Sequence, residues 1–365
     1  MPSRISELAR RLLSWTMILL PATLALAGPG WALPQAGPAP IPRPDRAPAD
    51  LGKPVQVFIL MGQSNMLGMG KIAGGDGSLE NAVKTKKLYP YLVDDAGNWT
   101  ERKDVRNVRV MVGKGGMQLF NNEWMTIKGK TIGPEIGIGH VVGNAVDAPV
   151  LILKSCIGNR SLGWDLLPPG SEPYEYDGKT IPGYRGTPEN PKGNGEKVEG
   201  AWYAGKQYDD DTENAKKVLS ELDKYYPGAK GYEIAGFFFW QGEKDLGNAA
   251  HADRYELNLV RFIKQLRKDF NAPEAKFVLA TLGEAKKGAG GNEGKILEAH
   301  LAVDGKTGKH KEFAGNVATV YSNPLSQGGS GNSHYGGNAE TYMNVGEAMG
   351  RAMVELIGTK GKASR

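Results

Sequence analysis

The sequence predicts an α/β protein in which a parallel sheet is covered by helices on both faces. Short apolar runs without strict polar alternation suit strands that are buried on both sides. These runs lie at residues 55–61, 150–153, 234–240, 276–282 and 317–321. Between them lie amphipathic stretches with helical spacing, at residues 135–146, 212–225, 252–270, 292–302 and 339–357. Alternating strands and helices favour a parallel sheet, which places ligands at the carboxyl ends of its strands.

Two longer insertions interrupt this alternation. Residues 77–130 contain turn signals and a short stretch around 107–112 that we expect to form a small antiparallel excursion. Residues 165–210 are loop-like and combine prolines with tyrosines and tryptophans. Since the sequence shows no internal repeat and no second globular pattern, we expect one domain over residues 55–358.

The amino-acid composition excludes few classes of protein. The chain has 365 residues, of which 40% are hydrophobic and 23% charged, as in an ordinary globular protein. The formal net charge of +5 is spread without a sustained basic block, so nothing in it indicates a nucleic-acid partner.

The N-terminal segment, residues 1–33, has the pattern of an export signal. Arg4, Arg10 and Arg11 precede an apolar run at residues 12–26, and Ala25-Leu26-Ala27 offers a small-x-small cleavage site. An uncleaved membrane anchor is the alternative, but the run is short and interrupted by Pro21. We therefore expect a bacterial protein exported to the periplasm or the extracellular space, without stable membrane insertion after cleavage.

Two further segments carry little folding information. Residues 34–54 are rich in Pro and Ala and are predicted to be a linker, and residues 359–365 are predicted to be a disordered tail. The single cysteine, Cys156, excludes an intrachain disulfide. If the protein is exported, the stability of its fold would then depend on core packing without help from a disulfide.

Small and polar residues follow the predicted strands. The first strand leads into Gly62-Gln63-Ser64-Asn65, the second into a segment from Ser155 to Ser161 and the third into Gln241-Gly242-Glu243-Lys244-Asp245; Gly331 to Gly337 precede the last helix. In a parallel sheet these four segments would meet at one edge.

This convergence has the composition of an acyl-transfer site. A serine hydroxyl needs a base to remove its proton, and the tetrahedral oxyanion needs hydrogen-bond donors. Ser64 could supply the hydroxyl and His334 the base. The backbone amides of Ser64 and Gly158 and the side-chain amide of Gln241 could form the oxyanion hole. Taken singly, Ser64 could be a helix cap and His334 a loop histidine, but their joint placement favours catalysis.

The motifs GQSNM, GNRSLGW and WQGEKD, followed by a histidine before the C-terminal helix, resemble those of the sialate O-acetylesterase-like carbohydrate esterases. That family is a branch of the SGNH (GDSL-like) hydrolase superfamily. The resemblance runs from about Val55 to Met353 and includes Gly133-Pro134-Glu135. It implies a three-layer α/β/α sandwich with a central, flavodoxin-like parallel sheet of five strands. It also implies deacetylation of O-acetylated carbohydrate through an acyl-enzyme, with no cofactor and no metal.

The resemblance also assigns roles to single residues. Ser64 corresponds to the nucleophile and His334 to the general base, Gly158 or Asn159 to the second block, and Gln241 to the amide of the third. The departure is Gly331, since related esterases commonly have aspartate three residues before the histidine. Either the carbonyl of Asn332 holds the imidazole, giving a Ser-His dyad, or a carboxylate from elsewhere does, with Glu243 and Asp245 the nearest. We favour the dyad.

Substrate contacts are less clearly marked. Arg160 could neutralise an acidic sugar such as a uronic or sialic acid, or it could be a solvated loop residue. The aromatic residues of the 165–210 insertion could stack on a sugar ring. The possible substrate-binding residues are Gln63, Asn65, Arg160, Trp164 and Trp202. Two alternatives stay open: a catalytically weak or inactive carbohydrate-binding protein on the same fold, and a lipase-like or thioesterase-like SGNH hydrolase.

Overall fold

The computed structural model describes residues 39–193, 195 and 201–358. The predicted export signal at 1–33 and the predicted tail at 359–365 lie outside these residues. Residues 39–50, within the predicted linker, form neither helix nor strand. The chain divides into a unit of residues 1–40 and a unit of residues 41–365, and every helix and strand given below belongs to the second unit.

A seven-stranded sheet in the order β11-β10-β9-β1-β6-β3-β4 forms the centre of this unit. The five predicted strands are β1 (Val55–Gly62), β6 (Val150–Ser155), β9 (Tyr232–Trp240), β10 (Lys276–Ala280) and β11 (Val317–Val320). They pair in parallel, and β1 lies between β6 and β9. Their order is the flavodoxin-like one, so the predicted fold class is confirmed.

The predicted antiparallel excursion is part of the main sheet, which corrects the expected number of strands from five to seven. β3 (Arg102–Gly113) pairs in parallel with β6 and antiparallel with β4 (Gly116–Met125). Val105, Val108 and Val110 of β3 are fully buried. Their burial stabilises a pairing between segments about 40 residues apart, which local sequence pattern does not reveal.

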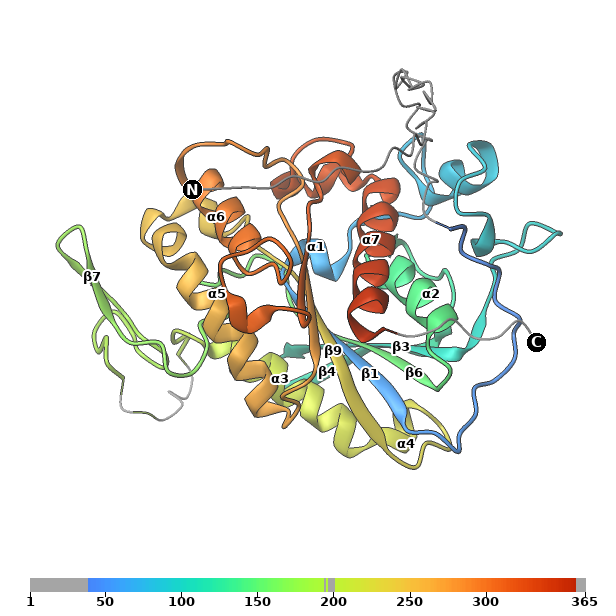
Figure 1. Ribbon diagram of the computed structural model, residues 1–365, viewed down its shortest axis with the longest axis horizontal. Helices are drawn as coiled ribbons and strands as arrows, with labels where there is room; N and C mark the ends of the chain where they lie inside the picture. The colour runs from blue at the N-terminus through green and yellow to red at the C-terminus, as the bar shows by residue number, and fades with distance from the viewer. Residues whose placement is uncertain (1–38, 194, 196–200, 359–365) are drawn as a thin grey trace, which may run out of the picture. The chain divides into compact units, whose positions relative to one another are not determined.

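Helices cover both faces of the sheet (Figure 1). α2 (Glu135–Ala145) and α7 (Ala339–Ile357) pack on one face, while α3 (Lys206–Ser220), α5 (Ala249–Asp269) and α6 (Gly291–Ala302) pack on the other. Strand β1 supplies both cores: Val57, Ile59 and Met61 face the second set, and Phe58 and Leu60 face the first. Burial on both faces explains why its sequence is apolar without alternation.

Shorter elements complete the unit. The helix predicted at 212–225 begins earlier, at Lys206, and is interrupted at Glu221 before α4 (Leu222–Tyr225). The remaining strands and short helices are α1 (Ser64–Leu67), β2 (Gly70–Lys71), η1 (Asn81–Thr85), η2 (Pro90–Leu92), β5 (Thr131–Ile132), β7 (Tyr174–Tyr176), β8 (Lys179–Ile181), η3 (Asp245–Gly247), η4 (Lys311–Phe313), η5 (Asn323–Leu325) and η6 (Gly331–Gly337). None of the helices within the described ranges is long and apolar enough to cross a membrane.

Candidate active site

A pocket of about 300 Å³ lies at the carboxyl ends of the central strands. All four segments that the sequence placed at this edge contribute to it. Its walls are Gln63, Ser64, Met69, Gly158, Asn159, Lys244, Asn332 and His334. The sheet topology therefore brings the predicted nucleophile and the predicted base to the same pocket, although 270 positions separate them in the sequence.

Ser64 begins α1, a single helical turn directly after β1, and is 6% exposed. The turn is held at its start, where the backbone N–H of Gln63 donates to the carbonyl of Trp240 at 3.3 Å. Gly62 has a φ of 145°, and a Cβ atom there would lie 2.4 Å from the carbonyl oxygen of Trp240. Glycine is therefore required where β1 passes into the turn that presents Ser64.

Gly158 lies against Ser64. A Cβ atom on Gly158 would lie 3.5 Å from the Cβ of Ser64. Within the described ranges, the backbone N–H groups of Ser64 and Gly158 donate to no other group of the protein. Both donors are thus free to bind the oxyanion that a carbonyl oxygen becomes when the Ser64 hydroxyl attacks its carbon. The neighbouring Asn159 has a φ of 57° and also lines the pocket.

Gln241 lies beneath the pocket rather than in its wall, which corrects its expected place. It is fully buried, and its Nε2 donates to Asp245 Oδ2 at 2.7 Å, to the Arg160 carbonyl at 2.8 Å and to Gln63 Oε1 at 3.1 Å. A primary amide has two N–H bonds, and three acceptors already compete for them. This geometry does not support an oxyanion contact by Gln241, which instead joins the Gln63 turn to the Arg160 loop.

His334 belongs to η6 and is partly exposed. Its φ of 56° lies in the left-handed region, as does that of Tyr335 at 53°, so neighbouring contacts must hold this segment. Tyr335 supplies such contacts: its hydroxyl accepts from the Gly283 N–H at 3.1 Å, and its ring stacks on Trp240 with centroids 5.8 Å apart. The packed tyrosine thereby fixes the backbone next to His334.

The imidazole of His334 has no hydrogen-bond partner among the residues that the structure describes. Neither the Ser64 hydroxyl nor the carbonyl of Asn332, the acceptor expected for a dyad, is bonded to it. Asn332 itself is exposed and lines the pocket. Catalytic hydrogen bonds are often long without substrate and tighten on binding, so this geometry is compatible with a catalytic base.

Glu243 is buried next to the His334 segment, with 4% exposure. Asn65 Nδ2 donates both to Glu243 Oε1 and, at 3.3 Å, to the carbonyl of Gly331, while Asn65 Oδ1 accepts from Tyr342 at 3.2 Å. Oε2 of Glu243 is buried without a partner. Burial, and next the negative charge of Glu284, raise the pKa of Glu243 to about 8.

Asp245 has a supporting place. It is fully buried and accepts from the backbone N–H of Leu162 at 2.9 Å and of Gly163 at 2.8 Å, besides Gln241. Burial raises the pKa of Asp245 to about 6, and these hydrogen bonds partly oppose the shift. With its oxygens occupied, Asp245 fastens the loop after β6 to the end of β9, so of the two expected acids only Glu243 lies next to Gly331.

Lys244 brings positive charge to the pocket wall, and Arg160 directly follows the lining residue Asn159 in the chain. The Arg160 guanidinium lies 4.5 Å from the ring centroid of Trp202, and its Nη1 donates to the Asn159 carbonyl at 3.1 Å. Trp202 is 40% exposed and donates from Nε1 to Asp165 at 2.8 Å. No carboxylate in the described part of the chain forms an ion pair with Arg160 or Lys244. Trp164 lies outside the pocket wall and is partly buried.

Sequence reasoning assigned no role to Met69, Lys244 or Glu284. Met69 and Lys244 line the pocket. Glu284 accepts the backbone N–H of Gly331 at 2.9 Å. The position of Glu284 shortly after β10 is a usable signal, because polar residues that follow parallel strands gather at the same edge of the sheet.

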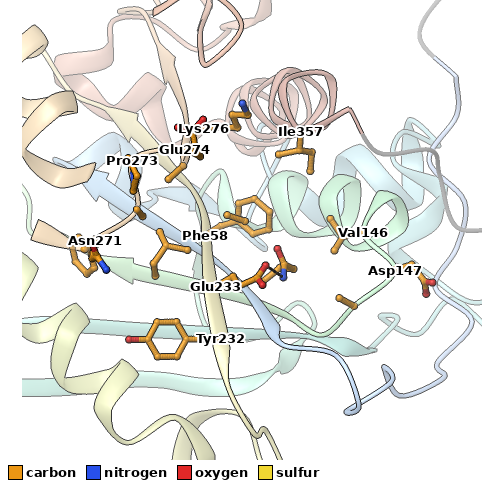
Figure 2. A pocket seen from close by; sticks show the side chains of 17 residues that line it. Phe58, Val146, Asp147, Tyr232, Glu233, Asn271, Pro273, Glu274, Lys276 and Ile357 are labelled. Carbon is orange, nitrogen blue, oxygen red and sulfur yellow. Dashed lines mark hydrogen bonds between the residues drawn. The ribbon is translucent and has the colours of Figure 1, made fainter. Parts of the chain in front are cut away.

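Other candidate sites lack this chemistry. Among the described residues, no group of three His, Cys, Asp or Glu side chains is arranged to hold a metal ion. A larger pocket of about 870 Å³ lies at the opposite edge of the sheet, at the amino ends of β1, β9 and β10 (Figure 2). Phe58, Tyr232, Glu233, Lys276 and Ile357 are among its lining residues. It contains no Ser, His or Cys side chain that could act as a nucleophile or base.

Residues 192–355 match the family model described as carbohydrate esterase, sialic acid-specific acetylesterase. This part of the chain, 164 of its 365 residues, is similar to that carbohydrate esterase family. The match includes Gln241, Glu243 and His334, whereas Ser64 and Gly158 precede it. The resemblance that the sequence motifs indicated is thereby confirmed.

Similar solved structures share little sequence with this chain. A protein from Arabidopsis thaliana is 18% identical with a TM-score of 0.49, covering 82% of this chain and 98% of its own. A carbohydrate acetylesterase from Xanthomonas citri is 12% identical with a TM-score of 0.47, over 81% of this chain and 55% of its own. NanS is 13% identical with a TM-score of 0.40, over 76% and 79%. No curated protein matches the chain.

Proposed function

We propose that this protein is a serine esterase that removes O-acetyl groups from carbohydrate through an acyl-enzyme intermediate. One observation carries the proposal: Ser64, Gly158 and His334, from three distant segments, surround one pocket at the carboxyl edge of the sheet. The family match over residues 192–355 supports the same class of reaction.

The residues of the pocket suit both halves of the reaction. His334 takes the proton of Ser64 as its Oγ attacks the acetyl carbonyl, and the free N–H groups of Ser64 and Gly158 stabilise the oxyanion. His334 then gives the proton to the sugar oxygen as its bond to the acyl carbon breaks, and the sugar leaves as a free hydroxyl. Water, activated by the same imidazole, hydrolyses the acetyl-serine and releases acetate.

The acid that supports His334 is proposed to be Glu243 rather than Asp245. Asp245 is occupied by the loop after β6, whereas Glu243 is bonded through Asn65 to the carbonyl of Gly331 and keeps one oxygen free. Once ionised, Glu243 stabilises the imidazolium more strongly than the carbonyl of a dyad would; because its pKa is raised to about 8, this support is greatest at mildly alkaline pH. Replacing each by its amide tests this: Glu243→Gln is expected to lower kcat about 10²-fold or more, and retained activity would favour the dyad.

The substrate is proposed to be an acetylated carbohydrate that carries negative charge, such as a sialate or an acidic polysaccharide. Arg160 is held against Trp202, and Lys244 lines the pocket; among the residues that the structure describes, neither forms an ion pair with a carboxylate. Burying a sugar carboxylate near these cations offsets part of its desolvation cost. The predicted export signal implies that such a carbohydrate is met in the periplasm or outside the cell.

The test is acetate release from an aryl acetate and from acidic and neutral acetylated carbohydrates. Ser64→Ala and His334→Ala are each expected to lose about 10³-fold or more of the activity. Activity that survives Ser64→Ala would refute the nucleophile. Binding of carbohydrate without acetate release would favour the binding protein, and a preference for long acyl chains would favour the lipase-like alternative.

A further inference from the structure

Two carboxylates from neighbouring strand ends meet at Gly331, the first residue of the segment that carries His334. Glu243 follows β9 and Glu284 follows β10. A Cβ atom on Gly331 would lie 2.5 Å from Oε1 of Glu243 and 2.7 Å from Oε2 of Glu284. The carboxylates thus occupy the space around one backbone position, which only glycine leaves open.

Glu284 also forms a direct bond to this segment. The backbone N–H of buried Gly331 donates to Oε2 of Glu284 at 2.9 Å. Without this acceptor the N–H would be buried and unsatisfied. Three residues after Gly331, the backbone of His334 adopts a left-handed conformation. Such a conformation is strained and persists only when neighbouring contacts hold it.

We propose that Glu284 is a positioning residue for His334, which fastens the start of its segment at Gly331 and forms with Glu243 a single carboxylate pair beside the site. This inference rests on the proposed function, because it assigns Glu284 an effect on the base of that reaction. Glu284 does not line the pocket, so it acts through Gly331 and Glu243.

The pair also controls charge near the imidazole. The charge of Glu284 contributes to raising the pKa of Glu243, to about 8, so near neutral pH Glu243 retains its proton. The other ionisable groups that face Glu243 are Asp245 of η3, Tyr255 of α5, Tyr335 of η6 and Tyr342 of α7. Burial raises the pKa of each tyrosine, so these phenols stay neutral and the carboxylates set the local charge.

Glu284→Gln removes the negative charge of the side chain but keeps its hydrogen bond, because the amide oxygen can still accept from the Gly331 N–H. Removing the negative charge of Glu284 lowers the pKa of Glu243. The acidic limb of the kcat/KM–pH profile on an aryl acetate is therefore expected to move to lower pH by about 0.5–1 unit.

Glu284→Asp is the complementary variant, since it keeps the charge and withdraws the carboxylate by one methylene. It is expected to lower kcat about tenfold through looser placement of His334 and to leave the acidic limb where it is. Glu355→Gln is the matched control: its side chain is 64% exposed and paired with Lys306, and losing this charge should change neither quantity.

The inference is overturned if Glu284→Gln keeps the wild-type pH profile and Glu284→Asp keeps the wild-type kcat. Thermal unfolding establishes that each variant is folded, and either variant alone decides if the other does not fold. Failure of the proposed function looks different, because wild type would then release no acetate or Ser64→Ala would remain active. In that case the NMR signals of the His334 ring at a single pH still test whether Glu284 positions it, since unchanged signals in Glu284→Asp contradict the inference.

Discussion

The ammonium of Lys154 donates to the main-chain oxygen of Leu67 at 2.8 Å, so a buried lysine of β6 closes the helical turn that begins at Ser64. Its counter-ion is Glu135 at the start of α2, whose other oxygen accepts from the Gly133 N–H at 3.0 Å. A cation at the last carbonyl of a one-turn helix satisfies a group that the helix itself leaves unpaired. The ion pair thereby links the position of Ser64 to β6 and α2.

Replacing Lys154 by methionine is expected to affect both stability and rate. Removing one partner leaves a buried carboxylate uncompensated, which costs about 3–5 kcal/mol of unfolding free energy. The double variant Lys154→Met/Glu135→Leu should recover part of that stability, since an apolar pair can replace a buried ion pair. It should not recover kcat, expected to fall about tenfold, because Leu67 stays unbonded. Denaturant unfolding and aryl acetate kinetics measure the two effects, and a double variant with wild-type kcat contradicts the positioning role.

Restoring an aspartate at position 331 is expected to damage the site rather than repair a triad. Its Cβ would lie 2.5 Å from Glu243 and 2.7 Å from Glu284, and its charge would join two carboxylates already there. Gly331→Asp should therefore lose about 2 kcal/mol or more of stability and most of its activity. Gly290→Asp is the control, because a Cβ there meets nothing within 4 Å and Asp suits the N-cap of α6. Higher activity in Gly331→Asp would show that the site lacks an acid.

The local pattern of apolar residues was sufficient to predict the central strands of the sheet, but it did not predict how the strands at its edge pair. The run at 55–61 predicts a strand because its residues are apolar on both faces, and β1 is buried on both. The pairing of β3 with β6 depends on contacts such as that between Val108 and Leu153, which are adjacent only in the folded chain. The sequence therefore indicated strand propensity near 107–112 without indicating its partner.

The candidate site, too, was predicted from the sequence only in part. The sequence predicted that Ser64, Gly158 and His334 lie at one site, because residues that follow parallel strands share the same edge of the sheet. It could not separate a side chain facing the pocket from one turned beneath it. Gln241 is drawn inward by Asp245 and by Tyr255, whose hydroxyl donates to its Oε1 at 2.7 Å. Hydrogen-bond competition of this kind is decided by packing and has no sequence signal.

Asp209 is expected to hold the 165–210 insertion in place. Its carboxylate accepts from the hydroxyls of Tyr184 and Tyr203, the latter at 2.8 Å, and pairs with Arg185 at 3.3 Å. Asp209→Ala should make this insertion more sensitive to limited proteolysis. It should raise KM for carbohydrate several-fold while leaving aryl acetate hydrolysis near wild type, since the small ester does not need the insertion. Asp210→Ala, which removes an ion pair with Lys206 on the same helix, is the control. Equal proteolysis in both variants contradicts the role of Asp209.

Glu243 is expected to make the protein less stable as pH rises. Its pKa is raised from the ordinary glutamate value of 4.5 to about 8 in the fold, so between these values the native state holds a proton that the unfolded state has released. The stability that comes from keeping this carboxyl neutral is complete below about pH 4.5 and is lost as pH rises toward 8. Glu243→Gln removes this dependence, so its unfolding free energy relative to wild type should increase by a few kcal/mol between pH 5 and 9. Urea unfolding of wild type and Glu243→Gln at pH 5, 7 and 9 measures the difference. Asp245 is present in both proteins, so its own pH dependence cancels in this difference.

Glu312→Gln provides a control of opposite sign, because Lys264 lowers the pKa of Glu312 and the resulting stabilisation is lost only as pH falls into the acid range. A difference that stays constant across the three pH values would mean that Glu243 is already ionised at pH 5, and the carboxylate pair with Glu284 would then carry its full charge throughout.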